Sequence, residues 1–512
     1  MPFEMPDVDD LVKEALKKSV MLYQEGRFVE AEIVLNQLVK VDPENLDALE
    51  LIGLVKHGQK QYEEAAEYFQ NVIDKDPERS ESHNNISLCF SCLGKVEESI
   101  EHAKRAIEID PEKHYYYTNL AIQYKQADQN ELSLETFARG MEIKPDDAGA
   151  WANLGSTYGH MKQLDKAIEC YDKAVSYDPS LDSAYVDRGY AKCLCGKFSE
   201  GWEDLNHRMA YFPPVESFKK TYNWDKLWDG EQSLVGKTIV IWCEQGVGDL
   251  IQFSRFLPEL KKEGCRILLH TPDPLLSLFR ANDFADEIEE TFADADYDYH
   301  CSIMNLPWLL NIPDRNLVPR GLLKINKDAD LDQYSDVFKI GITWAGNPRH
   351  PSDQKRSTKL ANFQDIHAIP GVKLFNLQKD LRARAYSNAP EPVDLAEGCD
   401  NMNIIDTSPF LEDFEDTAAI ISKMDMMITV DTVILHIAAS LGVPTLGLLH
   451  FNPDWRWTIE GEDTIWYPNV KLLRQPTKGD WEAPFKRATE IVQALVEGKA
   501  MFTKDICCTC ND

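Results

Sequence analysis

The segment WANLGSTYGHMKQLDKAIECYDKAVSYDP, residues Trp151–Pro179, decides the fold of the first part of the chain. It is the most complete copy of a helical pattern that ends in a proline and recurs every 34 residues. The closing prolines are Pro43, Pro77, Pro111, Pro145 and Pro179. Proline cannot continue a helix and restricts the residue before it, so each one separates two helices. A unit of this length cannot bury its apolar face alone, so we expect the units to stack into an all-α solenoid with a concave groove.

The repeat also agrees at the positions where its two helices must approach each other. Small residues recur at Gly53, Ser87, Ala121, Gly155 and Gly189 on the first helix, and at Ala31, Ala65 and Ala167 on the second. Small side chains there allow close helix packing. Phe69, Phe137 and Tyr171 fill the space between units, each contributing about 1.5–3 kcal/mol through burial. Five units agree at these positions, which argues against a chance spacing of the prolines.

These positions resemble the tetratricopeptide repeat. The resemblance is fullest at Trp151, Leu154, Gly155, Tyr158, Ala167, Tyr171, Ala174 and Pro179. We expect the solenoid to cover residues 11–210, as five full repeats followed by a capping unit. The resemblance implies that a protein or peptide binds in its groove.

Composition limits the classes of function. The chain has 512 residues, which suggests two to four domains, and a formal net charge of −32. Such an acidic chain lacks the basic surface that general binding to nucleic acid or anionic membranes requires. No apolar run is long enough to span a bilayer, and the first ten residues do not resemble a signal peptide. We therefore expect a cytoplasmic protein without a membrane span.

The 12 cysteines show no regular framework and are interpreted as reduced thiols. The C-terminal segment 501–512 ends in CCTCND, with Cys507, Cys508 and Cys510. A metal or redox role and a frayed tail are both open for these three cysteines.

After the solenoid, the pattern changes twice. Residues 211–234 lose the helical period and contain Trp224 and Trp228, which predicts a linker with aromatic anchors. From Lys237 onward, short apolar strands alternate with helices, which is typical of parallel βαβ units. The predicted strands are KTIVIW and RILLH, then KIGITWAG, VKLFNLQ, NIIDTS, MMITV and PTLGLL, with a closing helix over Pro484–Val496. We expect two Rossmann-like lobes over residues 235–330 and 335–500, with the active site in the cleft between them.

Two strand-to-helix turns carry candidate chemistry. In the first, EQGVGD, Gly246 and Gly248 let a substrate approach the backbone, and Gln245 and Asp249 lie on the same turn. In the second, a buried strand ends in Asp431 and Thr432, and His436 follows on the next helix, where unpaired amides suit a diphosphate. The structural alternatives are that Asp249, Asp431 or Thr432 only caps a helix, and that His436 packs in an interface.

Two further segments add candidate ligands. The loop WAGNPRHPSDQKRSTKL gathers Arg349, His350, Lys355, Arg356 and Lys359, a basic patch suited to phosphate, beside Asn347. The segment NPDWRW carries Trp455 and Trp457, whose faces can stack on a base or sugar. A solvated loop and structural tryptophans are the alternatives.

Together these segments resemble the GT-B glycosyltransferases, specifically the heptosyltransferase-like group and its tetratricopeptide-linked relatives. The resemblance implies that Asp249 is the general base, and that Asp431, Thr432 and His436 hold the donor diphosphate with Lys355 or Arg356. It also implies an inverting, metal-independent hexosyl or heptosyl transfer that needs no cofactor and uses a nucleotide-diphosphate sugar as co-substrate. No Asp-x-Asp motif at a strand end calls for a cation.

The combination of domains also resembles the O-linked N-acetylglucosamine transferases, in architecture only. The alternative to an enzyme is a non-catalytic interaction scaffold, in which the α/β part is a degenerate nucleotide-binding module. For the enzyme, we expect the acceptor to be a protein or glycan presented partly by the solenoid. The sequence does not determine the donor sugar or the identity of the acceptor.

Overall fold

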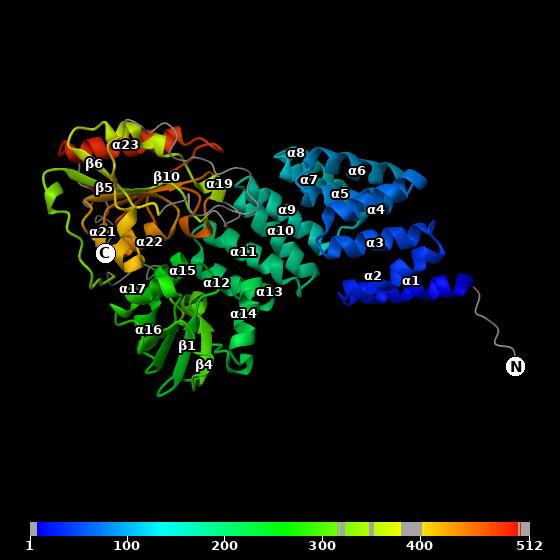
Figure 1. The fold of residues 1–512 in the computed structure, drawn as a ribbon, viewed down its shortest axis with the longest axis horizontal. Coiled ribbons are helices and arrows are strands. Elements are labelled where there is room, and N and C mark those ends of the chain that lie inside the picture. The colour runs from blue at the N-terminus through cyan, green and yellow to red at the C-terminus, as the bar shows by residue number, and fades with distance from the viewer. Residues whose placement is uncertain are drawn as a thin grey trace. The chain divides into compact units, whose positions relative to one another are not determined.

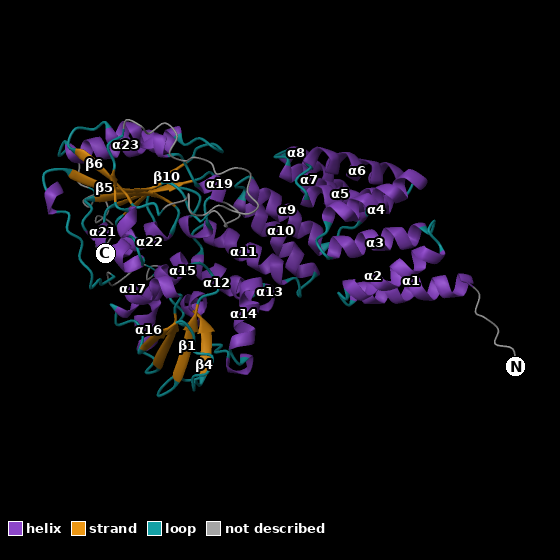
Figure 2. Ribbon diagram, viewed as in Figure 1, coloured by secondary structure: helices purple, strands orange, loops and turns teal. Residues whose placement is uncertain are grey.

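The computed structural model of the chain describes residues 8–314, 317, 323–347, 353–379, 402–499 and 502. The chain forms two compact units, Met1–Ala184 and Tyr185–Asp512 (Figure 1). All strands among the described residues belong to the second unit, where they form two groups (Figure 2). The expected fold class is confirmed: an all-α repeat unit is followed by an α/β unit with two parallel sheets.

The first unit consists of helical hairpins, and the repeated prolines lie in the connections between them. Pro43, for example, lies between the second and third helices, and Pro179 follows the tenth. The helices are α1 (Val8–Gln24), α2 (Phe28–Val41), α3 (Leu46–Gly58), α4 (Tyr62–Lys75), α5 (Ser80–Cys92), α6 (Val96–Ile109), α7 (His114–Gln126), α8 (Asn130–Ile143), α9 (Ala148–His160) and α10 (Leu164–Tyr177).

Close packing between the two helices of a repeat depends on glycine. A methyl group added to Gly155 on α9 would lie 2.8 Å from the Tyr171 ring, and one on Gly53 would lie 2.7 Å from Phe69. Both aromatic rings are buried. At Gly53 and Gly155 the second helix of the repeat therefore leaves no room for a side chain.

Replacing Gly155 with alanine is expected to destabilise the first unit by about 1–3 kcal/mol, because the Tyr171 ring must shift within a packed interior. Gly159 on the same helix is the matched control, since a methyl group there meets nothing within 4 Å. Gly159→Ala should be neutral or stabilising by about 0.5–1 kcal/mol, because alanine favours the helix. Urea denaturation of both variants checks this, and equal effects would contradict it.

The second unit begins within α11 (Asp182–Leu194) and continues through α12 (Phe198–Asn206), α13 (Arg208–Tyr211) and α14 (Pro213–Thr221). The expected linker 211–234 thus contains a helix, and its Tyr222 and Trp228 are buried. The boundaries of the five segments expected from the sequence stay a prediction.

Two parallel sheets form the framework of the second unit. Each sheet together with its helices is called a lobe, the first and the second in chain order. The first has strand order β3-β2-β1-β4 and the second β10-β9-β8-β5-β6-β7. The strands are β1 (Thr238–Trp242), β2 (Arg266–His270), β3 (Glu287–Glu289), β4 (Tyr299–Ser302), β5 (Phe338–Thr343), β6 (Val372–Asn376), β7 (Ile405–Asp406), β8 (Met426–Val430), β9 (Thr445–Leu449) and β10 (Val470–Arg474). The sequence predicted seven of them, and β3, β4 and β10 were not expected.

Helices lie in several of the connections between these strands, and the last helix follows β10. They are α15 (Val247–Phe253), α16 (Leu257–Lys261), α17 (Leu276–Arg280), α18 (Leu306–Leu309), α19 (Asp353–Arg356), α20 (Gln364–His367), α21 (Phe414–Ser422), α22 (Val433–Ser440) and α23 (Glu482–Val496).

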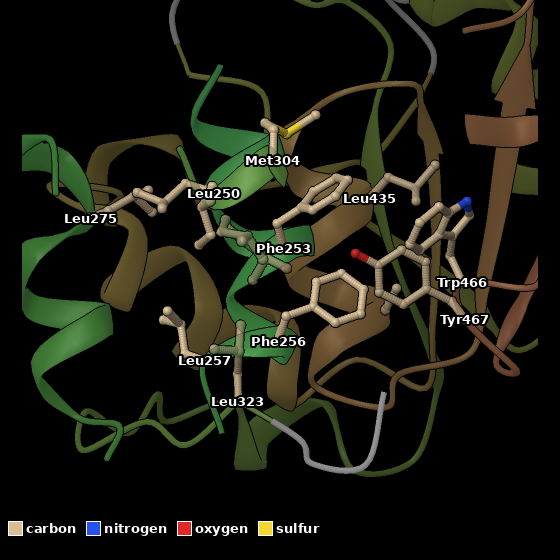
Figure 3. Close-up of a cluster of buried hydrophobic side chains, with 14 of the residues drawn as sticks. Leu250, Phe253, Phe256, Leu257, Leu275, Met304, Leu323, Leu435, Trp466 and Tyr467 are labelled. Atoms are coloured by element: carbon tan, nitrogen blue, oxygen red, sulfur yellow. The ribbon is translucent and has the colours of Figure 1, made fainter. Parts of the chain in front are cut away.

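The two lobes share one apolar core (Figure 3). Leu250 and Phe253 of α15 belong to the same cluster of buried side chains as Leu435 of α22, Trp466 and Tyr467. Trp202 of α12 joins this core, with its ring 6.0 Å from Phe253 and 5.5 Å from Trp455. The shared core therefore holds the α15 turn of the first lobe against α22 of the second.

A polar link also joins the lobes. Asp413, which caps α21, accepts hydrogen bonds from Ser277 of α17 at 2.8 Å and from Lys327 at 2.9 Å. Burial alone would raise the pKa of Asp413, but these bonds and the Asp416 N–H outweigh it and lower the pKa to about 2. Its charged form is therefore stabilised in the folded protein.

This link predicts a pH-dependent stability. Because the folded pKa of Asp413 lies below an unfolded value of about 3.9, its charge adds stability above that value, which is lost as pH falls toward about 2. Asp413→Asn keeps a helix cap but removes the charge, and should lower the unfolding free energy at pH 7 by on the order of 1–2 kcal/mol. In chemical denaturation, the difference in unfolding free energy between the variant and the wild type should close between about pH 4 and 2. The same replacement at the exposed Asp283 serves as the control. A difference in unfolding free energy that persists at low pH would contradict the role given to the Asp413 charge.

Candidate functional site

The second sheet has its topological switch point between β5 and β8. From there, β6 and β7 continue to one side, and β9 and β10 to the other. The carboxyl ends of such a strand pair are where ligands bind in open α/β sheets. Gly346 and Asn347 follow β5, while Asp431 and Thr432 follow β8, so the sheet brings these predicted residues to one edge.

Arg356 is the basic residue that reaches this edge. Its Nη1 donates to the backbone carbonyl of Asp431 at 3.2 Å. Its Nη2 lies 2.5 Å from where a methyl group on Gly346 would stand, so a side chain at Gly346 would displace the guanidinium. Lys355 and Asn347 are exposed, and Arg349 and His350 lie outside the described residues. Of the two basic candidates, Arg356 is therefore the one held at the switch point.

The start of α22 offers backbone amides beside Arg356. Thr432 occupies the N-cap position, but its side chain does not bond to the helix amides. Its hydroxyl instead lies 3.5 Å from that of Thr429. The Leu435 N–H donates to the Thr432 carbonyl at 3.1 Å, while the two preceding amides of α22 receive no bond from the cap side chain. A helix start of this kind suits an anion.

The EQGVGD turn places Asp249 in two interactions. One carboxylate oxygen accepts the Gly246 N–H at 2.9 Å, which is the capping interaction considered as an alternative. The other oxygen pairs with the guanidinium of Arg456 from the second lobe. Burial raises the pKa of Asp249, while the charge of Arg456 opposes the rise. Asp249 is therefore both a helix cap and half of an ion pair between the lobes.

The two predicted turns meet directly. A methyl group on Gly248 would lie 3.0 Å from Cδ2 of His436, so a side chain there would require His436 to shift by a few tenths of an ångström. His436 is 4% exposed, and its Nδ1 lies 2.9 Å from the Tyr467 hydroxyl. Burial lowers the pKa of His436 well below its usual value, which keeps the ring neutral. The geometry is that of interface packing, and donor binding by His436 stays a prediction.

Arg456 is the centre of the charged site. Besides Asp249, it pairs with Asp454 at 2.6 Å, and its guanidinium lies 4.6 Å from the centre of the Trp455 ring. Asp431 faces the same cation, yet burial and then the negative charge of Asp454 raise its pKa to about 6. Three carboxylates therefore surround one arginine.

Both predicted tryptophans are largely buried. Trp457 is fully buried and stacks on His436, with ring centres 5.5 Å apart. Trp455 lines a small recess with Gln245, Tyr190, Trp202, Leu205, Arg208 and Met304. The structure thus brings Gln245 and Trp455 together, while Trp457 supports His436. Their binding of substrate stays a prediction.

Sequence reasoning missed a buried ion pair at the carboxyl end of the first sheet. Arg208 of α13 donates to Glu244 through Nε at 2.7 Å and to the Asn305 side chain at 2.6 Å. Ser302, at the end of β4, also donates to Glu244. The position of Glu244 directly after β1 was the available signal, and Arg208 had none because its helix was assigned to the solenoid cap.

Three family models match the chain, two of the tetratricopeptide repeat and one of a glycosyltransferase family. Residues 16–79, 51–114 and 148–181 match models of the tetratricopeptide repeat, and residues 393–458 match glycosyltransferase family 9 (heptosyltransferase). The chain combines tetratricopeptide repeats with a glycosyltransferase family 9 region. The latter match includes Asp431, Thr432, His436 and the segment NPDWRW, but not Asn347 or Arg356.

A curated relative, Protein FlbA of Caulobacter vibrioides, is 23% identical over 329 residues, covering 57% of this chain and 52% of its own length. The chain thus spans about half of that relative. Solved structures similar to the chain include MamA, with 24% identity, 33% of this chain and 98% of that one covered, and a TM-score of 0.28. A thermophilic TPR protein of Thermus thermophilus is 18% identical, with 35% of this chain and 98% of that one covered and a TM-score of 0.33. The type IV pilus biogenesis factor PilW is 20% identical, with 41% of this chain and 97% of that one covered and a TM-score of 0.37. At these scores the likenesses carry no further inference.

None of the described helices combines the length and apolar character needed to cross a membrane.

Proposed function

We propose that the protein is a glycosyltransferase that moves a sugar from a nucleoside-diphosphate donor to an acceptor. The observation that carries this proposal is the meeting of the Gly248–Asp249 turn with the start of α22. One turn supplies a carboxylate and the other supplies helix amides next to an arginine. The family 9 match over the second turn supports the same reading.

The donor diphosphate would lie at the carboxyl ends of β5 and β8. The amides at the start of α22 and the guanidinium of Arg356 would hold its negative charge. As the bond between the sugar and the diphosphate breaks, its electron pair stays on the diphosphate, and these groups stabilise that charge. In this role they replace a metal ion, so we propose a metal-independent reaction.

Asp249 would act as the general base. It takes the proton of the acceptor hydroxyl while the hydroxyl oxygen forms the new bond to the anomeric carbon, an effect worth roughly 10²–10⁴-fold in rate. A single displacement of this kind inverts the anomeric configuration.

We propose that the tetratricopeptide groove binds a protein or peptide that is, or carries, the acceptor. Stacked repeats form an extended concave surface suited to such partners. The alternative is a non-catalytic scaffold that binds a nucleotide without transfer. The pairing of Asp249 with Arg456 favours this alternative, because a carboxylate held by a cation is a weaker base.

A donor screen tests the proposal. The purified chain is incubated with UDP-, GDP-, ADP- and CMP-sugars and a host lysate, with and without EDTA, and products are detected by mass spectrometry. We expect one donor to give a hexose or heptose mass increment on an acceptor, also in EDTA. Nucleotide binding without transfer or hydrolysis of any donor would favour the scaffold.

A further inference from the structure

We propose that Arg456 exchanges partners during the reaction: it holds Asp249 in the donor-free protein and moves to the donor diphosphate when that binds. The proposal rests on the proposed function and adds to it a coupling between donor binding and the release of Asp249. Donor binding then frees the base, so the acceptor is activated only when a donor is present.

The contacts of Arg456 fit such an exchange. The residue is 8% exposed, and its two terminal nitrogens contact Asp249 and Asp454. Its Nε is buried and has no hydrogen-bond partner among the described residues. A buried guanidinium with an unused donor is incompletely satisfied, and phosphate oxygens accept from guanidinium in the same forked geometry as carboxylates.

The charge balance favours the exchange. Asp249, Asp454 and Asp431 all lie in the field of Arg456. Arg356 donates to the backbone carbonyl of Asp431 and also pairs with Asp353 at 3.4 Å. A diphosphate entering beside Asp431 adds further negative charge next to these carboxylates. A second cation that turns toward the diphosphate adds to the positive charge that Arg356 and the amides of α22 supply, and Arg456 is the cation between the two turns.

The backbone around Arg456 is fixed, so movement falls to the side chain. Thr458 has φ of 55°, a left-handed conformation that costs about 1–3 kcal/mol and persists only when its surroundings hold it. Arg474 supplies that support by donating to the carbonyls of Trp457 at 2.6 Å and Thr458 at 3.0 Å. Trp466 also donates to the carbonyl of Arg456 at 2.8 Å.

A double-mutant cycle read by pyrophosphate binding in calorimetry tests the exchange. If Asp249 competes with phosphate for Arg456, Asp249→Asn should tighten pyrophosphate binding by roughly tenfold, and Arg456→Gln should weaken it by at least as much. In the Arg456→Gln background, Asp249→Asn should change the affinity less than about twofold. Simple repulsion by Asp249 predicts tightening in both backgrounds, which would overturn the exchange.

Thr432→Val and Arg356→Ala separate failure of the exchange from failure of the donor site. If these weaken binding while Asp249→Asn has no effect, the donor site stands and the exchange is wrong. If the wild-type protein binds no pyrophosphate, or binds it unaffected by any of the four changes, both proposals fall. Arg456→Lys, which keeps the charge but loses the fork, replaces Arg456→Gln if the latter does not fold, and should also weaken binding.

Discussion

Replacing Asp249 with asparagine is expected to lower sugar transfer by roughly 10²–10⁴-fold, because the amide cannot take the acceptor proton. Asparagine has nearly the same shape and can still accept the Gly246 N–H that starts α15. The loss should appear in kcat, and nucleotide binding should persist. Nucleoside diphosphate release, measured with the donor found in the screen, gives the rate.

Asp454→Asn is the matched control for this loss. Asp454 is the other carboxylate paired with Arg456, so its replacement disturbs the same arginine without touching the proposed base. We expect a much smaller loss of transfer than for Asp249→Asn. Equal losses would mean that the ion pairs of Arg456 matter and that Asp249 is not the base.

Replacing Glu244 with alanine is expected to destabilise the second unit by about 3–5 kcal/mol, because it leaves the guanidinium of Arg208 buried without its counter-charge. The Glu244 side chain is fully buried and that of Arg208 is 5% exposed. The pair also fixes the carboxyl end of β1, directly before the Gly246–Asp249 turn. Thermal and urea denaturation followed by near-ultraviolet circular dichroism measures the loss.

Two variants control for other effects of this change. Arg208→Met combined with Glu244→Leu removes both charges and should recover much of the lost stability, since no unpaired charge remains. Glu287→Ala breaks an exposed pair with Arg266 and should change stability little. If Glu244→Ala is no worse than Glu287→Ala, the buried pair contributes nothing.

The fold could be predicted from local patterns because its strongest signals are local. The 34-residue period places every helix pair of the first unit, and apolar runs mark β1, β5, β8 and β9, the first two before glycine turns. Two of the three strands that were missed lack such a run. β3 has three residues with a single apolar side chain, and β4 reads YHCS. Their pairing with β2 and β1 fixes them as strands, and pairing is a tertiary property.

The candidate site divides in the same way. Asp249, Asp431 and Thr432 follow buried strands, so the general rule for parallel sheets locates them. Arg456 comes after β9 at the same interval as Asp249 comes after β1, but nothing in its own segment signals the pairing, and Asp249 is 207 residues away along the chain. Only the packing of the two lobes brings them together. The burial of His436 has the same origin, because its neighbour Gly248 comes from the first lobe.

A crystal structure of the protein with a nucleoside diphosphate bound, chosen by thermal shift from UDP, GDP, ADP and CDP, tests the central claim most directly. The account predicts the diphosphate at the carboxyl ends of β5 and β8, between the first amides of α22 and the guanidinium of Arg356, with Asp249 facing its terminal phosphate. A diphosphate bound at the first sheet, or in the tetratricopeptide groove, would contradict it.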